Sequence, residues 1–155
     1  VDIGTPPKFR AKGNFVNADI CNLPLNDNSF DIITCSHVIE HVINPFEILT
    51  ELHRVCKPGG IIYIEAPSHR STMLPFGFNF WDDPTHIRPY TTTSLERLLF
   101  QSDFKPLAKG TKRSLSAILL GLPYMFYGSL KGDEQARSLL PAYLFGFYIY
   151  ALGKK

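Results

Sequence analysis

The sequence has few cysteines and little charge of one sign, and both shortages exclude whole classes of protein. Its 155 residues include three cysteines, Cys21, Cys35 and Cys56, and none of them forms a C-x-x-C pair. Zinc ribbons and disulfide frameworks are therefore poor interpretations, and a reducing cytoplasm is the better one. The formal net charge is +2 and no long basic run occurs. We expect no nucleic-acid partner, because phosphate binding needs a basic stripe.

The sequence also lacks an apolar run long enough for an ordinary membrane-spanning helix. Two apolar stretches, 114–128 and 141–152, are shorter than the roughly 20 residues that such a helix needs. Pro123 also interrupts the first stretch. We interpret both as buried core or substrate pocket. The alternative is a surface that contacts a membrane or a lipid-linked substrate.

The chain contains an alternation of strand-like and helix-like segments, which we assign to a single domain over residues 1–155. Apolar runs predict strands at 1–4, 15–18, 30–36, 61–66, 105–112 and 143–151. Asn44 and Pro45 open a helix that Lys57–Gly60 ends, and Thr93 with Glu96 resembles the capping box of a second helix. This order predicts an α/β fold, a Rossmann-like open twisted sheet with helices on both faces. We expect the sheet to be mostly parallel, with an antiparallel strand near the C-terminus.

Polar side chains follow three of the predicted strands. They belong to Asp2, Asp19 and Ser36, and open parallel sheets bind ligands at the carboxyl ends of their strands. A carboxylate there can accept hydrogen bonds from ribose hydroxyls or from an exocyclic amine, and Ile3 and Ile20 could pack on a flat base. Taken singly, each aspartate is more often a turn or cap residue. Taken together, they indicate a nucleoside site.

Four motifs occur in a fixed order along the chain. They are D-x-x-x-L-P at Asp19–Pro24, N-S-F-D at Asn28–Asp31, E-H-V at Glu40–Val42 and L-x-R-x-x-K-P-G-G at Leu52–Gly60. With a later D-x-x-H at Asp83–His86, this combination resembles the class I, methyltransferase type 11-like family. The resemblance covers residues 1–105. It implies S-adenosylmethionine as the methyl donor, S-adenosylhomocysteine as product, and a small-molecule, sugar-linked or lipid-linked acceptor. Segments 67–93 and 106–142 would be the variable substrate and lid regions.

The resemblance also implies roles for the strand-end residues. Asp2 would bind the ribose hydroxyls beside Ile3, Asp19 the adenine amine with Ile20 on the ring, and Ser36 and His37 the methionine part. His86 would lie over the mouth of the active site. An acceptor oxygen or nitrogen can need its proton removed, and a histidine is the natural base. We expect His86 to be this base, with His37 as the second choice.

The resemblance departs from the family at the start of the chain. Family members carry a strand, a glycine-rich D/E-x-G-x-G-x-G loop and a helix before the position of Val1, and these are absent here. Gly59 and Gly60 follow a helix and cannot replace that loop. We therefore expect an N-terminally incomplete domain, truncated rather than naturally shortened. A chain that begins at Val1 is expected to bind the cofactor weakly or not at all. A degenerate, non-catalytic binding module is the alternative function.

A competing motif starts at His37. Residues His37–His41 spell H-x-x-E-H, the pattern of inverted zinc peptidases, in which both histidines would ligate zinc on one helix face and Glu40 would act as base. The motif directly follows a buried strand and lies close before Pro45, so a long helix is not expected. No helix with a third ligand is evident. We keep a zinc hydrolase as a minor alternative and expect no metal.

Overall fold

A computed structural model describes residues 16–73, 79–112, 123, 126–133, 146 and 148–155. The strands are β1 (Phe30–Ser36), β2 (Cys56–Pro67), β3 (Lys105–Lys112) and β4 (Tyr148–Lys154). The longer helices are α1 (Pro45–Val55) and α2 (Thr92–Gln101), and three short 3-10 helices are η2 (Ile39–His41), η3 (His69–Met73) and η4 (Phe80–Asp82). Within these residues, no helix is both long and apolar enough to cross a membrane.

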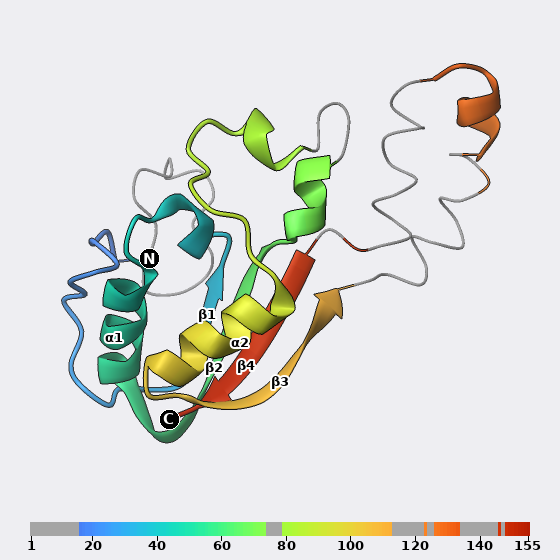
Figure 1. Cartoon of the computed structure of the whole chain (residues 1–155). Coiled ribbons are helices and arrows are strands. Elements are labelled where there is room, and N and C mark those ends of the chain that lie inside the picture. The colour runs from blue at the N-terminus through green and yellow to red at the C-terminus, as the bar shows by residue number, and fades with distance from the viewer. Residues whose placement is uncertain (1–15, 74–78, 113–122, 124–125, 134–145, 147) are drawn as a thin grey trace.

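The four strands form an open sheet in the order β1-β2-β4-β3 (Figure 1). β1 and β2 pair in parallel, whereas β4 is antiparallel to both of its neighbours. β1, β2 and β3 therefore run in one direction and β4 runs against them. This arrangement confirms the predicted Rossmann-like sheet with a reversed strand near the C-terminus. In the described part of the chain, β1 lies at an edge of the sheet.

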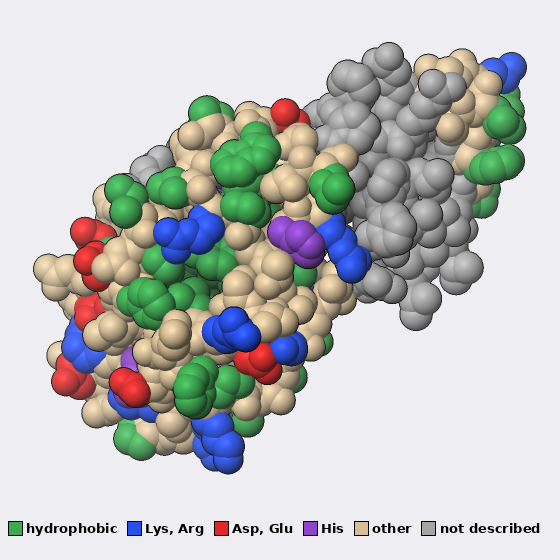
Figure 2. Space-filling model, in the orientation of Figure 1, with side chains coloured by type: hydrophobic (Ala, Val, Ile, Leu, Met, Phe, Trp, Pro, Cys, Tyr) green, Lys and Arg blue, Asp and Glu red, His purple; other side chains and the backbone are tan. Residues whose placement is uncertain are grey.

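α1 and α2 cover one face of this sheet and lie side by side (Figure 1). Ile48 of α1, Leu95 and Leu99 of α2, and Ile62 and Ile64 of β2 are fully buried in one apolar core. Burial of each such side chain stabilises the fold by about 1.5–3 kcal/mol. Of the helices predicted on both faces, the described residues show this one layer. Acidic and basic side chains are interspersed over the face seen in Figure 2.

The start and end of α1 follow directly from local sequence. The Asn44 side chain accepts a hydrogen bond from the backbone N–H of Phe46 at 3.2 Å, and Pro45 occupies the first helical position. The helix ends at Val55, and β2 begins at the next residue. A Cβ atom at Gly60 would lie 2.8 Å from the sulfur of Cys56 and 3.0 Å from the backbone oxygen of Asp31. Glycine is therefore needed where β2 passes Asp31 of β1.

Three predicted features differ in the structure. β2 spans Cys56–Pro67 rather than 61–66, so it includes the Lys57–Gly60 segment that was expected only to end the helix. Residues 16–18 form no strand, and Asp19 opens a turn instead. The capping box of α2 consists of Thr91 and Ser94, which exchange hydrogen bonds of 3.0 and 2.8 Å, so the prediction of Thr93 with Glu96 was wrong. Tyr90 bridges to Ser68. This contact holds the chain extended up to Thr91, so the helix begins directly after it.

The last predicted strand is shifted along the chain. β4 starts at Tyr148 and ends at Lys154 rather than at Ala151. The first residues of the prediction, 143–145, lie outside the described residues, as do the predicted strand at 1–4 and most of the apolar stretch at 114–128. The strand predicted at 105–112 agrees with β3 at both ends.

Candidate active site

The carboxyl end of β1 carries a strained histidine. Ser36 ends the strand and pairs with Glu65 of β2. The backbone of His37 then takes φ +54°, in the left-handed region that residues other than glycine rarely adopt. Its N–H donates to the backbone oxygen of Glu65 at 3.0 Å, which fixes this turn. The His37 side chain is 40% exposed.

Two carboxylates face the His37 ring. Its Nδ1 lies 3.4 Å from Oε1 of Glu40, and its Nε2 lies 3.4 Å from Oε1 of Glu65. The edge of the ring also contacts Tyr148, with centroids 4.7 Å apart. His37 is thus held between η2, β2 and β4 while part of its ring remains open to solvent.

Glu65 is a buried acidic residue near the carboxyl end of the apolar strand β2. Burial would raise the pKa of Glu65, but hydrogen bonds from the hydroxyl of Tyr63 and from Nζ of Lys112 outweigh this effect, so the pKa is lowered. Burial, together with the contact to Glu65, raises the pKa of Tyr63 to about 12. His37 therefore faces a carboxylate that is ionised at neutral pH. Glu65 was not among the residues predicted from the sequence. The one sequence feature that marks it is the presence of an acidic residue within an apolar run.

Glu40 follows on η2 and is fully buried. Neither of its carboxylate oxygens has a hydrogen-bond partner among the described residues. Its backbone oxygen accepts hydrogen bonds from the N–H groups of Ile87 (2.8 Å) and Arg88 (3.3 Å). These bonds join η2 to the segment that carries His86.

His86 lies in a tightly packed position. Its side chain is 14% exposed, and its ring stacks on Phe80 with centroids 4.3 Å apart. Nδ1 lies 2.6 Å from the backbone oxygen of Phe80. The ring also lies against His41, 4.7 Å between centroids. The structure thus brings the two histidine-bearing segments of the sequence together.

The helix that a zinc-peptidase motif requires is not formed. η2 comprises three residues, and the left-handed backbone of His37 lies outside it. His37 and His41 therefore do not share the face of one helix, and the H-x-x-E-H pattern does not build the site from which it is known.

A cavity of about 650 Å³ lies beside β1. Ile20 and Ser36 both line it, together with Val38. Asp19 is exposed next to Ile20, and its Oδ1 accepts a hydrogen bond from the N–H of Cys21 at 2.9 Å. The predicted cofactor residues Asp2 and Ile3 lie outside the described residues.

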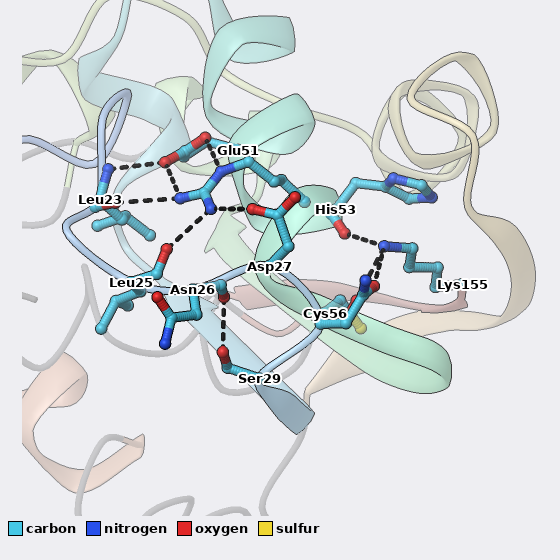
Figure 3. Close-up of polar contacts among 11 residues, drawn as sticks. Leu23, Leu25, Asn26, Asp27, Ser29, Glu51, His53, Cys56 and Lys155 are labelled. Carbon is cyan, nitrogen blue, oxygen red and sulfur yellow. Dashed lines mark hydrogen bonds and ion pairs between the residues drawn. The ribbon is translucent and has the colours of Figure 1, made fainter.

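The loop after Asp19 is held by side chains of α1. Oε1 of Glu51 accepts a hydrogen bond from the N–H of Leu23 at 2.7 Å (Figure 3). Arg54 donates to the backbone oxygens of Leu23 (3.0 Å) and Leu25 (2.8 Å) and pairs with Asp27. The arginine of the L-x-R motif therefore positions the loop that follows Asp19.

Comparison with known proteins finds methyltransferase sequences that are similar to this chain. Residues 5–64 match the family described as methyltransferase domain. An uncharacterized methyltransferase of Mycobacterium bovis (strain BCG / Pasteur 1173P2) is 43% identical over 72 residues, which cover 46% of this chain and 27% of that protein. A demethylmenaquinone methyltransferase of Paenarthrobacter aurescens (strain TC1) is 45% identical over 56 residues, 36% of this chain and 22% of that protein. The chain thus spans about a quarter of the length of the curated relatives that it matches.

Solved structures agree on the fold. An S-adenosylmethionine-dependent methyltransferase from Archaeoglobus fulgidus aligns over 93% of this chain and 68% of its own, with a TM-score of 0.57 and 22% identity. One from Mesorhizobium loti aligns over 90% and 68%, with a TM-score of 0.64 and 14% identity. The [4+2]-cyclase SpnF also aligns, over 92% and 56%, with a TM-score of 0.59 and 23% identity.

The sheet order and the polar carboxyl end of β1 define a Rossmann-like α/β protein with a candidate small-molecule site. Residues 5–64 are similar to the methyltransferase domain family, and the fold is that of S-adenosylmethionine-dependent methyltransferases of known structure.

Proposed function

We propose that this chain carries the adenosine and acceptor sides of a site that transfers a methyl group from S-adenosylmethionine to a small molecule. The observation that carries the proposal is the meeting of Ile20 and Ser36 in one cavity, with His37 directly after Ser36. Ile20 comes from one segment, and Ser36 and His37 come from another. The family resemblance assigns all three residues to the cofactor.

The chemistry of the residues fits the adenosine part of the cofactor. The exposed carboxylate of Asp19 can accept a hydrogen bond from the adenine amine while Ile20 packs on the ring. Ser36 and His37 would contact the methionine part, and Asp2 and Ile3 remain predictions for the ribose. Bound S-adenosylmethionine supplies an already activated methyl group, so the protein mainly has to hold donor and acceptor in line.

We assign to the cofactor only the part of the cavity that lies beside the carboxyl end of β1. The lining also includes Phe30, Ile32 and Thr34, which follow the edge of β1 toward its start. In the described part of the chain this edge has no strand partner. Unpaired backbone groups at a strand edge favour pairing with another strand over contact with a nucleoside.

Burial favours His37 over His86 as the acceptor base. His86 is 14% exposed, and its Nδ1 lies at hydrogen-bond distance from the oxygen of Phe80, whereas His37 is 40% exposed at the end of β1. When His37 takes the proton of an acceptor oxygen or nitrogen, Glu40 and Glu65 lie within ion-pair distance of the imidazolium that forms. General-base catalysis of this kind contributes about a hundredfold or more.

The acceptor is a small molecule in this proposal. The name of the Paenarthrobacter relative makes demethylmenaquinone the first acceptor to test. The [4+2]-cyclase SpnF has a similar fold, so the fold alone does not determine the reaction. A non-catalytic module is the second candidate, and transfer of the methyl group from S-adenosylmethionine to an acceptor separates the two.

The experiment is saturation-transfer NMR of S-adenosylhomocysteine with the 155-residue chain. We expect saturation of the adenine protons with a dissociation constant of about 1 mM, equivalent to roughly 4 kcal/mol. Asp19→Ala should remove most of the signal. Asp31→Ala is the matched control, because Asp31 is an exposed aspartate at the opposite end of β1. Absence of adenine saturation, or an equal loss in both variants, would contradict the proposal.

A further inference from the structure

Three potential ligands converge beside the proposed catalytic residues. Glu40, His41 and His86 each place one ligand atom so that all three atoms lie within 4.8 Å of one another. Nε2 of His41 lies 3.9 Å from Oε1 of Glu40. The three residues come from two segments that the backbone hydrogen bonds of Glu40 hold together.

Hydrogen bonds fix which ring nitrogen of each histidine is available. Nδ1 of His86 faces the backbone oxygen of Phe80, which only accepts, so Nδ1 carries the hydrogen. Thr85 donates its hydroxyl hydrogen to Asp83 at 2.6 Å, so its oxygen accepts from Nδ1 of His41 at 2.8 Å. In the neutral form of each ring, the lone pair is then on Nε2. Metal-binding histidines are oriented in this way by hydrogen bonds from their second nitrogen.

The carboxylate of Glu40 lacks a hydrogen-bond donor among the described residues, and the nearby histidine nitrogens are Nδ1 of His37 at 3.4 Å and Nε2 of His41 at 3.9 Å from Oε1. This carboxylate is fully buried, and no described residue donates a hydrogen bond to either oxygen. An ionised carboxylate in such surroundings is strongly unfavourable unless a positive charge compensates it. The lone pair of His41 Nε2 lies nearby and adds further negative potential. A metal ion between these groups would satisfy all three.

We propose that Glu40, His41 and His86 bind one divalent transition-metal ion, with Zn²⁺ as the first to test. Two imidazoles and one carboxylate form a donor set that suits Zn²⁺ and related ions. Tetrahedral bonds of about 2.0–2.2 Å bring ligand atoms roughly 3.3 Å apart, so the side chains close in by ~1 Å on binding. Three protein ligands leave a fourth position for water or an oxygen of a substrate. The ion would also tie the His86 segment to η2.

The test uses the 155-residue chain after treatment with a chelator and dialysis. Zn²⁺ is titrated in competition with a chromophoric chelator, and Co²⁺ is added separately to record its visible ligand-field bands. We expect one equivalent of each ion to bind. Glu40→Gln and His86→Ala should each weaken Zn²⁺ binding by about a hundredfold or more, at or beyond the upper end of losses from second-shell partners.

Two control variants address other zinc ligands on the surface. His69→Ala removes an exposed histidine outside the cluster, and Cys21→Ser removes an exposed thiol. Neither variant should change the affinity or the stoichiometry. Glu40→Gln separates a loss of metal binding from a loss of the fold, because glutamine keeps the shape of the glutamate side chain. Near-ultraviolet circular dichroism checks that this variant is folded.

Failure of stoichiometric binding would overturn the metal site, and so would unchanged Zn²⁺ affinity in Glu40→Gln and His86→Ala. This outcome is separable from the methyl-transfer proposal, because binding of S-adenosylhomocysteine at Asp19 is measured in the presence of the chelator.

Discussion

Arg54 donates hydrogen bonds to both carboxylate oxygens of Glu51, three positions earlier on α1, at 2.7 and 2.9 Å. The remaining N–H groups of this guanidinium reach the backbone of Leu23 and Leu25 and the side chain of Asp27. One ion pair on a helix therefore positions the loop that follows Asp19. Several measurable properties of the chain depend on this and related contacts.

Arg54→Met should loosen the loop and lower the free energy of unfolding by about 2 kcal/mol, because it leaves Glu51 and two backbone oxygens without their donor. Chemical denaturation measures the loss, and faster amide exchange at Leu23 locates it. Arg97→Met is the control, since Arg97 is exposed on α2. Equal losses in the two variants would show that the network does not hold the loop.

Acid should weaken the fold through Glu51. Hydrogen bonds from Arg54 hold the pKa of Glu51 below its ordinary value. Its contribution is therefore present above the unfolded pKa of about 4.3 and is lost as the pH falls through the lower folded value. Unfolding free energies measured from pH 6 to about pH 3 should fall less steeply in Glu51→Gln than in the parent chain. Parallel curves would contradict this origin of acid sensitivity.

Gly60→Ala should destabilise the start of β2 by more than about 2 kcal/mol, since two of the three close neighbours of the new methyl group are backbone oxygens. Gly132→Ala is the matched control. At Gly132 φ is +83° and nothing lies within 4 Å of the added Cβ, so only backbone strain of about 1 kcal/mol is expected. Thermal or urea denaturation compares them, and a smaller effect at Gly60 would refute the steric argument.

The three cysteines should react at very different rates with a thiol reagent. Cys21 is exposed, whereas Cys35 and Cys56 are buried. Burial raises the pKa of Cys35 to about 12, and only the thiolate attacks. We expect one rapidly reacting thiol in the native chain and three in denaturant. Burial and the nearby Asp19 also raise the pKa of Cys21, so it should react more slowly than free cysteine. Rapid reaction that persists in Cys21→Ser would show a more open core.

Local patterns predicted the elements whose causes are local. The apolar run at Phe30–Ser36 and the Asn44–Pro45 cap gave the limits of β1 and the start of α1. Residues 16–18 form no strand, because strand formation depends on a neighbouring strand. The choice between Thr91 and Thr93 as cap depends on the bridge between Ser68 and Tyr90, which no local pattern contains.

The candidate site shows the same division. Strand-end logic and family resemblance selected Asp19, Ile20 and Ser36, and the last two line one cavity. The convergence of His41 with His86 depends on the path of a connection of more than 40 residues, so sequence spacing could not reveal it. The buried position of Glu65 is likewise a property of the assembled sheet.

Amide chemical-shift mapping tests the central claim most directly. The ¹⁵N-labelled 155-residue chain is titrated with S-adenosylhomocysteine up to several times the roughly millimolar dissociation constant expected. We predict that the largest shifts fall at residues 19–21 and 36–38. Little change is expected at Glu96 of α2 and at Lys109 of β3, the strand at the opposite edge of the sheet from β1. Shifts centred elsewhere, or no shifts at saturating ligand, would contradict a methyl-donor site at the carboxyl end of β1.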